Sequence, residues 1–240
     1  MQQIYKEILK AKTEKRKLLA ILLDPDKLKV ESLKNLVLKI NSSPATHIFL
    51  GGSIVANNQT QLIAVEIKKH TYLPLILFPG NTNQITDAAD GILFLSLLSG
   101  RNPEYLIEQH VKAAPLLQKS TLEIIPTGYI LINGGVETAV QRVSKTTPIE
   151  HSDIEAATYT ALAGEYSGKQ LMYLEAGSGA KSPVPTKMIS EVSKSLNIPL
   201  IVGGGLRSNS QIKDSYNAGA DMIVIGTAFE ENHGFLENIH

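Results

Sequence analysis

The chain has 240 residues, and 23 lysines and arginines balance 23 aspartates and glutamates, so its formal net charge is zero. Such a balance argues against nucleic acid as a partner. The absence of cysteine excludes a disulfide framework, a thiolate metal site and a cysteine nucleophile. Segment 1–17 is charged, and no apolar run is long enough to span a bilayer. We therefore expect a cytoplasmic protein without an integral membrane segment.

Short apolar runs alternate with segments of helical pattern along the whole chain. Near-continuous apolar runs of this length are typical of parallel strands that are buried on both faces. Strand followed by helix, eight times over, predicts a TIM-type (β/α)8 barrel as a single domain over residues 1–240. The predicted strands are Leu18–Leu23, Thr46–Leu50, Leu73–Phe78, Gly91–Leu95, Leu122–Pro126, Gln170–Leu174, Leu200–Val202 and Met222–Ile225. A doubly wound open sheet would instead favour one glycine-rich turn after the first strand.

The segments between the strands carry signals for helices. An opening helix over Gln3–Lys12 is expected to plug the barrel floor or to pack beside it. The segment Gly80–Asp90 after the third strand is short and polar, so we expect a modified excursion there rather than a full barrel helix. Pro103 suits the first turn of a helix that runs toward Lys119. Ser152 and Ser208 are each predicted to cap the helix that follows.

Three late apolar runs end in glycine-rich turns, at Leu171–Gly179, Ile198–Leu206 and Met222–Phe229. Glycine accepts positive φ and has no Cβ, so backbone N–H groups in such turns can converge on an anion. In (β/α)8 barrels the loops after the last strands often hold a phosphate group. The sequence therefore predicts an enzyme that acts on a phosphorylated substrate.

The first two strands end in residues that suit a hard cation. Asp24 and Asp26 follow the first strand beside Lys27, and Ser53 follows the second. Mg²⁺ prefers such oxygen ligands and often shares them with substrate phosphate. The alternatives are an Asp-Pro turn that caps the next helix and a serine that acts as an N-cap. The histidines have no metal-ligand spacing, and we predict surface or packing roles for them.

Two polar residues are predicted to share one side of the sixth strand. Alternation along the strand places Tyr173 and Glu175 on the same side, just before the glycine-rich turn. A carboxylate beside a phosphate pocket is unfavourable unless it has a chemical role or a nearby cation. Glu175 is therefore predicted to be a general base toward a substrate hydroxyl. The alternative is a structural carboxylate that binds loop amides.

A set of short motifs is spread over nearly the whole chain. They are LLDPDK (22–27), FLGGS (49–53), LFPGN (77–81), SGRNP (99–103), PTGYILINGG (126–135), ALAGEY (161–166), YLEAGSG (173–179), VGGGLRS (202–208) and IGTAFE (225–230). In these motifs the sequence resembles the geranylgeranylglyceryl phosphate synthase family, which includes the bacterial heptaprenylglyceryl phosphate synthases. DPDK after the first strand and GT after the eighth are similar to the second of the family's two groups, which has bacterial members.

The resemblance implies a prenyltransferase that joins sn-glycerol 1-phosphate to an allylic polyprenyl diphosphate with Mg²⁺, releasing diphosphate for lipid biosynthesis. A geranylgeranyl donor and a homo-oligomer are expected. Asp24 and Ser53 would hold the metal, and Glu175 and Tyr173 would be catalytic. The glycerol phosphate would be held by Tyr173, Leu174, Glu175, Ala176, Gly177, Ser178, Gly179, Gly204, Gly205, Gly226 and Thr227. The wall of the prenyl groove is predicted at Leu97, Leu98, Tyr129, Ile130 and Leu131.

Other functions would use the same phosphate-binding loops. A sugar-phosphate isomerase or lyase would need an acid–base pair across the mouth, and Asp24 with Glu175 would qualify. An FMN-dependent oxidoreductase would be a yellow protein. A non-catalytic phosphate-binding protein would show no detectable reaction. Turnover of a soluble sugar phosphate, without a response to prenyl diphosphate, would select the first of these.

Overall fold

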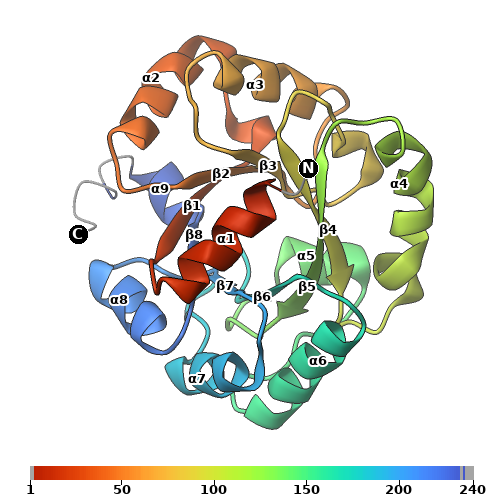
Figure 1. Cartoon of the computed structure of the whole chain (residues 1–240), viewed down its shortest axis with the longest axis vertical. Helices are drawn as coiled ribbons and strands as arrows, with labels where there is room; N and C mark the ends of the chain where they lie inside the picture. Colours follow the sequence, from red (N-terminus) through yellow and green to blue (C-terminus); the bar gives the residue numbers. More distant parts are fainter. Residues whose placement is uncertain (1–2, 233–234, 236–240) are drawn as a thin grey trace.

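Eight parallel strands close into a barrel in chain order, with β1 paired to both β2 and β8 (Figure 1). The computed structural model describes residues 3–232 and 235. The predicted (β/α)8 barrel is therefore confirmed. The strands are β1 Leu18–Leu23, β2 His47–Leu50, β3 Leu75–Leu77, β4 Gly91–Leu97, β5 Glu123–Leu131, β6 Leu171–Glu175, β7 Leu200–Gly203 and β8 Met222–Ile225.

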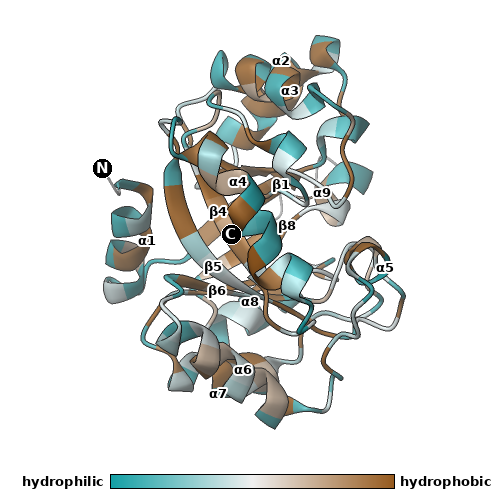
Figure 2. Ribbon diagram, turned by 90° about the vertical axis from the view of Figure 1, so that its right-hand side faces the viewer, coloured by the Kyte–Doolittle hydropathy of each residue, from teal (hydrophilic) through white to brown (hydrophobic). Residues whose placement is uncertain are grey.

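Helices surround the barrel and bury their apolar faces against it. Figure 2 shows the strands as mostly hydrophobic, whereas the helices carry hydrophilic residues as well. In the described part of the chain, no helix has the length and apolar character that crossing a bilayer requires. The helices are α1 Gln3–Thr13, α2 Val30–Asn41, α3 Gln59–Lys68, α4 Gln109–Leu117, α5 Ala139–Ser144, α6 Ile154–Tyr166, α7 Thr186–Ser195, α8 Asn209–Asn217 and α9 Thr227–Glu231.

The opening helix α1 plugs the floor of the barrel, which decides between the two predicted positions. It lies across the barrel end in Figure 1. Ile4, Ile8 and Ala11 are buried in the cluster that fills the barrel interior. The Glu123 carboxylate of β5 accepts hydrogen bonds from the N–H groups of Ile4 and Tyr5, each at 2.7 Å. These bonds satisfy amides that the first turn of a helix otherwise leaves free.

Strand β5 continues past Pro126, where the sequence predicts its end. Pairing between β5 and β6 begins at Thr127, and the Pro126 carbonyl on that side accepts from Gln170 N at 2.7 Å. The N–H that proline lacks would therefore lie before the paired region, so no ladder hydrogen bond is lost. As a result Tyr129, Ile130 and Leu131 belong to the strand rather than to a loop.

The segment after β3 contains no α-helix, as predicted, and forms only a 3₁₀ turn at Thr82–Gln84. β3 itself is short, and it pairs with β4 only at Ile76 and Leu77. β4 pairs with β5 along its whole length, from Gly91 to Leu97. From Leu93 to the carboxyl end of β4, the wall of the barrel is therefore open on the side of β3.

The two predicted helix caps differ in outcome. Ser208 caps α8 by accepting a hydrogen bond from Gln211 N at 3.2 Å, as expected. The prediction for Ser152 is wrong, because Asp153 caps α6 instead and accepts from Ala156 N at 3.0 Å. The helix starts one residue later than the capping-box pattern indicates, and a carboxylate at that position is an equally good cap.

A histidine at the start of β2 should make stability depend on pH. His47 is buried, and burial together with the nearby Arg16 lowers its pKa from 6.5 to about 4. Between pH about 6.5 and about 4, His47 is therefore protonated in the unfolded chain but neutral in the folded chain. The free energy of unfolding falls as the pH drops through this range. This difference corresponds to about 3 kcal/mol. Urea unfolding of His47→Gln should show a flatter dependence across this range, and an unchanged slope would contradict the prediction.

Candidate active site

The loops at the carboxyl ends of the strands enclose a cavity that several charged and polar side chains line, here called the polar cavity. Most of the predicted site residues line it, from loops that are far apart in the sequence. They are Asp24, Ser53, Glu175, Gly177, Ser178, Gly179, Gly204, Gly205, Gly226 and Thr227. Tyr173, Leu174 and Ala176 do not line the cavity. The Tyr173 side chain lies inside the barrel, and those of Leu174 and Ala176 lie in the core between barrel and helices.

The turns after β6 and β7 approach each other so closely that only glycine fits. Gly204 has a φ of +79°, and Gly177 has a φ of +94°. A Cβ on Gly204 would collide with Glu175 Oε1 and would lie 2.6 Å from Gly177 N. The Ser178 and Thr227 hydroxyls are 3.2 Å apart and bring the loop after β6 against the loop after β8. Three loops thus surround one space in which backbone N–H groups can bind an anion.

We expect Gly204→Ala to weaken the binding of a phosphorylated ligand by at least about tenfold, because the added Cβ must displace the turn after β6. The matched control is Gly168→Ala. Gly168 has a φ of +87°, but nothing lies within 4 Å of its Cβ position. Both variants carry the backbone strain, and only the first carries the collision. Equal ligand affinity in the two variants, measured by calorimetry, would show that the close approach is unimportant.

Glu175 is buried at the bottom of this cavity and faces Tyr173, as the alternation predicts. Its Oε1 accepts a hydrogen bond from Gly177 N at 2.8 Å, so the structural role considered above is present. A Cβ added to Gly203 would lie 2.7 Å from Glu175 Oε2 and 2.5 Å from the Tyr173 hydroxyl, so only glycine fits beside this pair. Burial raises the pKa of the Glu175 carboxyl, although the nearby Tyr173 hydroxyl and the Gly177 N–H both favour its charged form. A buried carboxylate with one oxygen uncommitted to the loop is well suited to accept a proton.

The cationic side chains at the rim are held by ion pairs. Lys27 Nζ lies 2.7 Å from Glu230 and 3.7 Å from Asp24. Partial burial favours neutral Lys27, but the hydrogen bond and charge of Glu230, with Asp24, raise its pKa overall. Arg207 also lines the cavity, and its Nη1 lies 3.2 Å from Glu231. Lys27 was expected from the sequence to help neutralise the leaving diphosphate, whereas Arg207 was not assigned to substrate binding.

The two carboxylates after β1 have different roles. Asp26 accepts from Ala56 N through both oxygens, at 3.1 and 3.2 Å, and ties this turn to the loop after β2. Asp24 accepts from Asp26 N at 3.1 Å, so the Asp-Pro turn is formed, but Asp24 also lines the cavity. Ser53 lines the same cavity and caps no helix, because α3 begins only at Gln59.

Asp24 and Ser53 place one carboxylate and one hydroxyl in the part of the polar cavity that follows β1 and β2, here called the corner of Asp24 and Ser53. Among the described residues, no group of three or more His, Asp or Glu side chains could hold a metal ion. Mg²⁺ is commonly bound by one or two carboxylates together with water and substrate phosphate oxygens. The corner therefore fits Mg²⁺ when a phosphorylated substrate supplies further oxygens.

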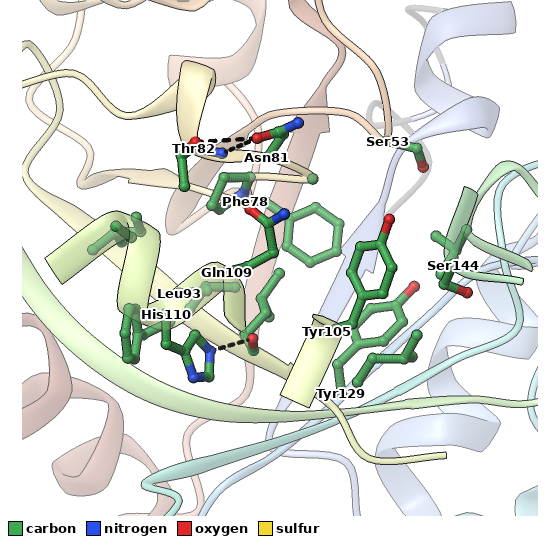
Figure 3. A pocket seen from close by; sticks show the side chains of 18 of the residues that line it. Ser53, Phe78, Asn81, Thr82, Leu93, Tyr105, Gln109, His110, Tyr129 and Ser144 are labelled. Atoms are coloured by element: carbon green, nitrogen blue, oxygen red, sulfur yellow. Dashed lines mark hydrogen bonds between the residues drawn. The ribbon is translucent and has the colours of Figure 1, made fainter. Parts of the chain in front are cut away.

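A second cavity, lined mostly by apolar side chains and here called the apolar groove, runs through the opening between β3 and β4 (Figure 3). It shares Ser53, Phe78 and Tyr129 with the polar cavity, so the two cavities meet. Of the predicted wall residues, Leu97 and Tyr129 line it. Leu98, Ile130 and Leu131 do not, because their side chains pack elsewhere in the core.

Aromatic rings mark the junction of the two cavities. The Phe78 ring lies 5.9 Å from that of Tyr129 and 5.6 Å from that of Tyr173, and the two tyrosine rings are 5.4 Å apart. Burial, with the nearby Glu175, raises the pKa of Tyr129 well above its usual value, so the hydroxyl stays neutral. Phe78 was not assigned to the site from the sequence, although it is the last residue of the third predicted strand.

Comparisons with known proteins agree with this arrangement. A model of the PcrB family matches residues 10–240. Geranylgeranylglyceryl phosphate synthase of Flavobacterium johnsoniae is 57% identical over 235 residues, which are 98% of this chain and 97% of that protein. The protein of the same name from Zunongwangia profunda is 56% identical over 96% of this chain and 98% of its own length.

Among solved structures, the (S)-3-O-geranylgeranylglyceryl phosphate synthase of Thermoplasma acidophilum with its substrate sn-glycerol-1-phosphate superimposes with a TM-score of 0.93. It is 33% identical, and the match covers 100% of this chain and 96% of that chain. The family model and these relatives span nearly the whole barrel. The chain therefore belongs to the PcrB family, that of the geranylgeranylglyceryl phosphate synthases.

Proposed function

We propose that this chain is a prenyltransferase that forms an ether bond between sn-glycerol 1-phosphate and an allylic polyprenyl diphosphate. The observation that carries the proposal is the junction of the polar cavity, lined by glycine-rich turns, with an apolar groove at Ser53, Phe78 and Tyr129. A substrate pair with one small phosphorylated partner and one hydrocarbon chain matches both cavities. The names of the relatives support this pair, and they favour geranylgeranyl diphosphate as the donor.

Glycerol phosphate would lie with its phosphate against the glycine-rich turns after β6, β7 and β8. Backbone N–H groups at Gly204, Gly205 and Thr227 suit the phosphate oxygens there. The free terminal hydroxyl would then point toward Glu175, which takes its proton as the oxygen attacks the allylic carbon. The raised pKa of Glu175 makes it a stronger base than an exposed glutamate.

The donor would place its diphosphate at the corner of Asp24 and Ser53 and its chain in the apolar groove. Mg²⁺ bound in this corner would neutralise charge on the leaving diphosphate. Asp24 and Ser53 would hold the metal, and Lys27 would add positive charge from the rim. The new O–C bond forms as the C–O bond to diphosphate breaks, so one proton and one diphosphate leave for each ether formed.

The sugar-phosphate isomerase or lyase is the less favoured alternative. It needs Asp24 and Glu175 as a free acid–base pair. Asp24, however, accepts a hydrogen bond from Asp26 N in its own turn, and its other oxygen lies 3.7 Å from Lys27 Nζ. A soluble sugar phosphate has no hydrocarbon chain that could occupy the apolar groove. The geometry thus favours a substrate with a long hydrocarbon chain.

The direct test is incubation of the purified protein with Mg²⁺, radiolabelled sn-glycerol 1-phosphate and prenyl diphosphates of several lengths, followed by extraction into organic solvent. Label in the organic phase is the expected result, and the preferred donor identifies the chain length. Label that stays in water with every donor would reject the prenyltransferase. Turnover of soluble sugar phosphates would then be measured instead.

A further inference from the structure

Where the apolar groove passes, one edge of β4 is not paired with β3. β3 ends at Leu77, opposite Ile92, while β4 continues to Leu97. The bonds Glu123 N to Asp90 O and Leu98 N to Tyr129 O place the backbone groups of even-numbered β4 residues toward β5. The backbone groups of Leu93, Leu95 and Leu97 therefore point to the side that β3 has left.

His110 on α4 covers this edge. Its Nε2 lies 2.6 Å from the carbonyl oxygen of Leu95, and its ring stacks on Phe94 with centroids 4.0 Å apart (Figure 3). A carbonyl only accepts hydrogen bonds, so Nε2 carries the proton. Burial lowers the pKa of His110, with the Leu95 carbonyl opposing and the charge of Lys169 adding to the effect. The ring is therefore a neutral donor in an apolar groove.

The position of His110 separates it from the reacting groups. Leu95, Phe94 and His110 all line the apolar groove, but none of them lines the polar cavity. In Figure 3 His110 and Ser53 lie at opposite sides of the groove. A contact made at His110 is thus a contact with the distal part of a bound chain.

We propose that His110 is a positioning residue for the hydrocarbon chain of the donor, because it satisfies the Leu95 carbonyl where the barrel wall is open. The inference rests on the proposed function, since it assigns a role in the same donor groove. With His110 present, a prenyl chain meets a Leu95 carbonyl that already accepts a hydrogen bond. Without the His110 N–H, water binds the Leu95 carbonyl in the empty groove. A bound prenyl chain must then displace that water and leave the carbonyl without a hydrogen-bond partner.

The loss of binding free energy then affects the prenyl diphosphate alone, and only prenyl diphosphates whose chain is long enough to reach Leu95. Glycerol phosphate binds in the other cavity and should not be affected. Turnover at saturating donor should change little, because the reacting ends lie near Ser53 and Glu175. A residue that merely stabilised the fold would instead affect both substrates and every chain length.

The test compares His110→Leu with His110→Gln in the full chain. Both variants lose the stacked ring on Phe94, but only glutamine keeps an N–H that can reach the Leu95 carbonyl. For His110→Leu we expect KM and the calorimetric Kd of a 20-carbon prenyl diphosphate to rise about tenfold. With a five-carbon prenyl diphosphate the change should stay below about twofold, and KM for glycerol phosphate should not move. His110→Gln should recover most of the loss.

Three outcomes overturn the inference. They are an unchanged 20-carbon KM in His110→Leu, an equal penalty for the five- and 20-carbon donors, and a glutamine variant as impaired as the leucine variant. A wild-type protein that neither binds nor turns over any prenyl diphosphate would reject the proposed function itself, and His110 as a donor-positioning residue with it. Normal wild-type activity with an unaffected leucine variant would reject only the role of His110.

Discussion

Glu175→Gln is expected to lower kcat by about 10²- to 10⁴-fold, which is the usual contribution of a positioned general base. Glutamine keeps an oxygen that can accept the hydrogen bond from Gly177 N, so the turn after β6 should retain its shape. The glycine-rich turns that surround the phosphate space are unchanged in this variant. KM for glycerol phosphate should therefore stay within a few-fold of the parent. Steady-state kinetics with both substrates varied measures the two effects separately.

The pH dependence of the reaction gives a second readout for Glu175. Burial raises the pKa of this carboxyl, and the base must be ionised to accept a proton. In the parent protein kcat should therefore fall as the pH drops through a pKa above the ordinary value for glutamate. The acidic limb should disappear in Glu175→Gln. Parent-like turnover in the variant, or an unchanged acidic limb, would remove Glu175 from the mechanism.

Asp24→Asn is expected to abolish most activity and to raise the Mg²⁺ concentration for half-maximal rate by at least about 100-fold. Residues that bind a metal directly affect its affinity at least as much as the residues that orient them. The asparagine oxygen can still accept from Asp26 N, so the turn at Pro25–Lys27 should persist. The change thus removes a charge from the cavity with little change of shape. Initial rates across a Mg²⁺ titration give the result.

Asp26→Asn is the matched control, because it makes the same substitution in the same turn. Asp26 binds Ala56 N, and asparagine retains an oxygen for that bond. Its Mg²⁺ titration should match that of the parent protein. If Asp24→Asn also matched the parent, the metal would bind elsewhere and the assignment of Asp24 and Ser53 would fail.

The positions of the candidate site residues were largely predictable because these residues follow strand ends. In a parallel barrel the carboxyl ends of all strands meet at one end, so Asp24, Ser53 and the turn after Glu175 had to face one mouth. The glycines were predictable for a similar reason, since a positive φ or a close approach such as that at Gly204 excludes other residues. The different roles of Asp24 and Asp26 were not predictable, because they depend on a bond to Ala56 in another loop.

The sequence alone determined the barrel, the modified segment after β3 and the glycine-rich turns, and it offered the plugging helix as one of two options. These features depend on local periodicity and on residue types with few conformations. Only the tertiary structure decided that β5 runs through Pro126, that Tyr129 faces the site and that His110 meets Leu95 in an opening of the wall. The first and last of these depend on which backbone groups of distant segments pair, and the orientation of Tyr129 follows from the extension of β5. Such pairing is settled between segments distant in the chain, where the pattern within one segment carries no information.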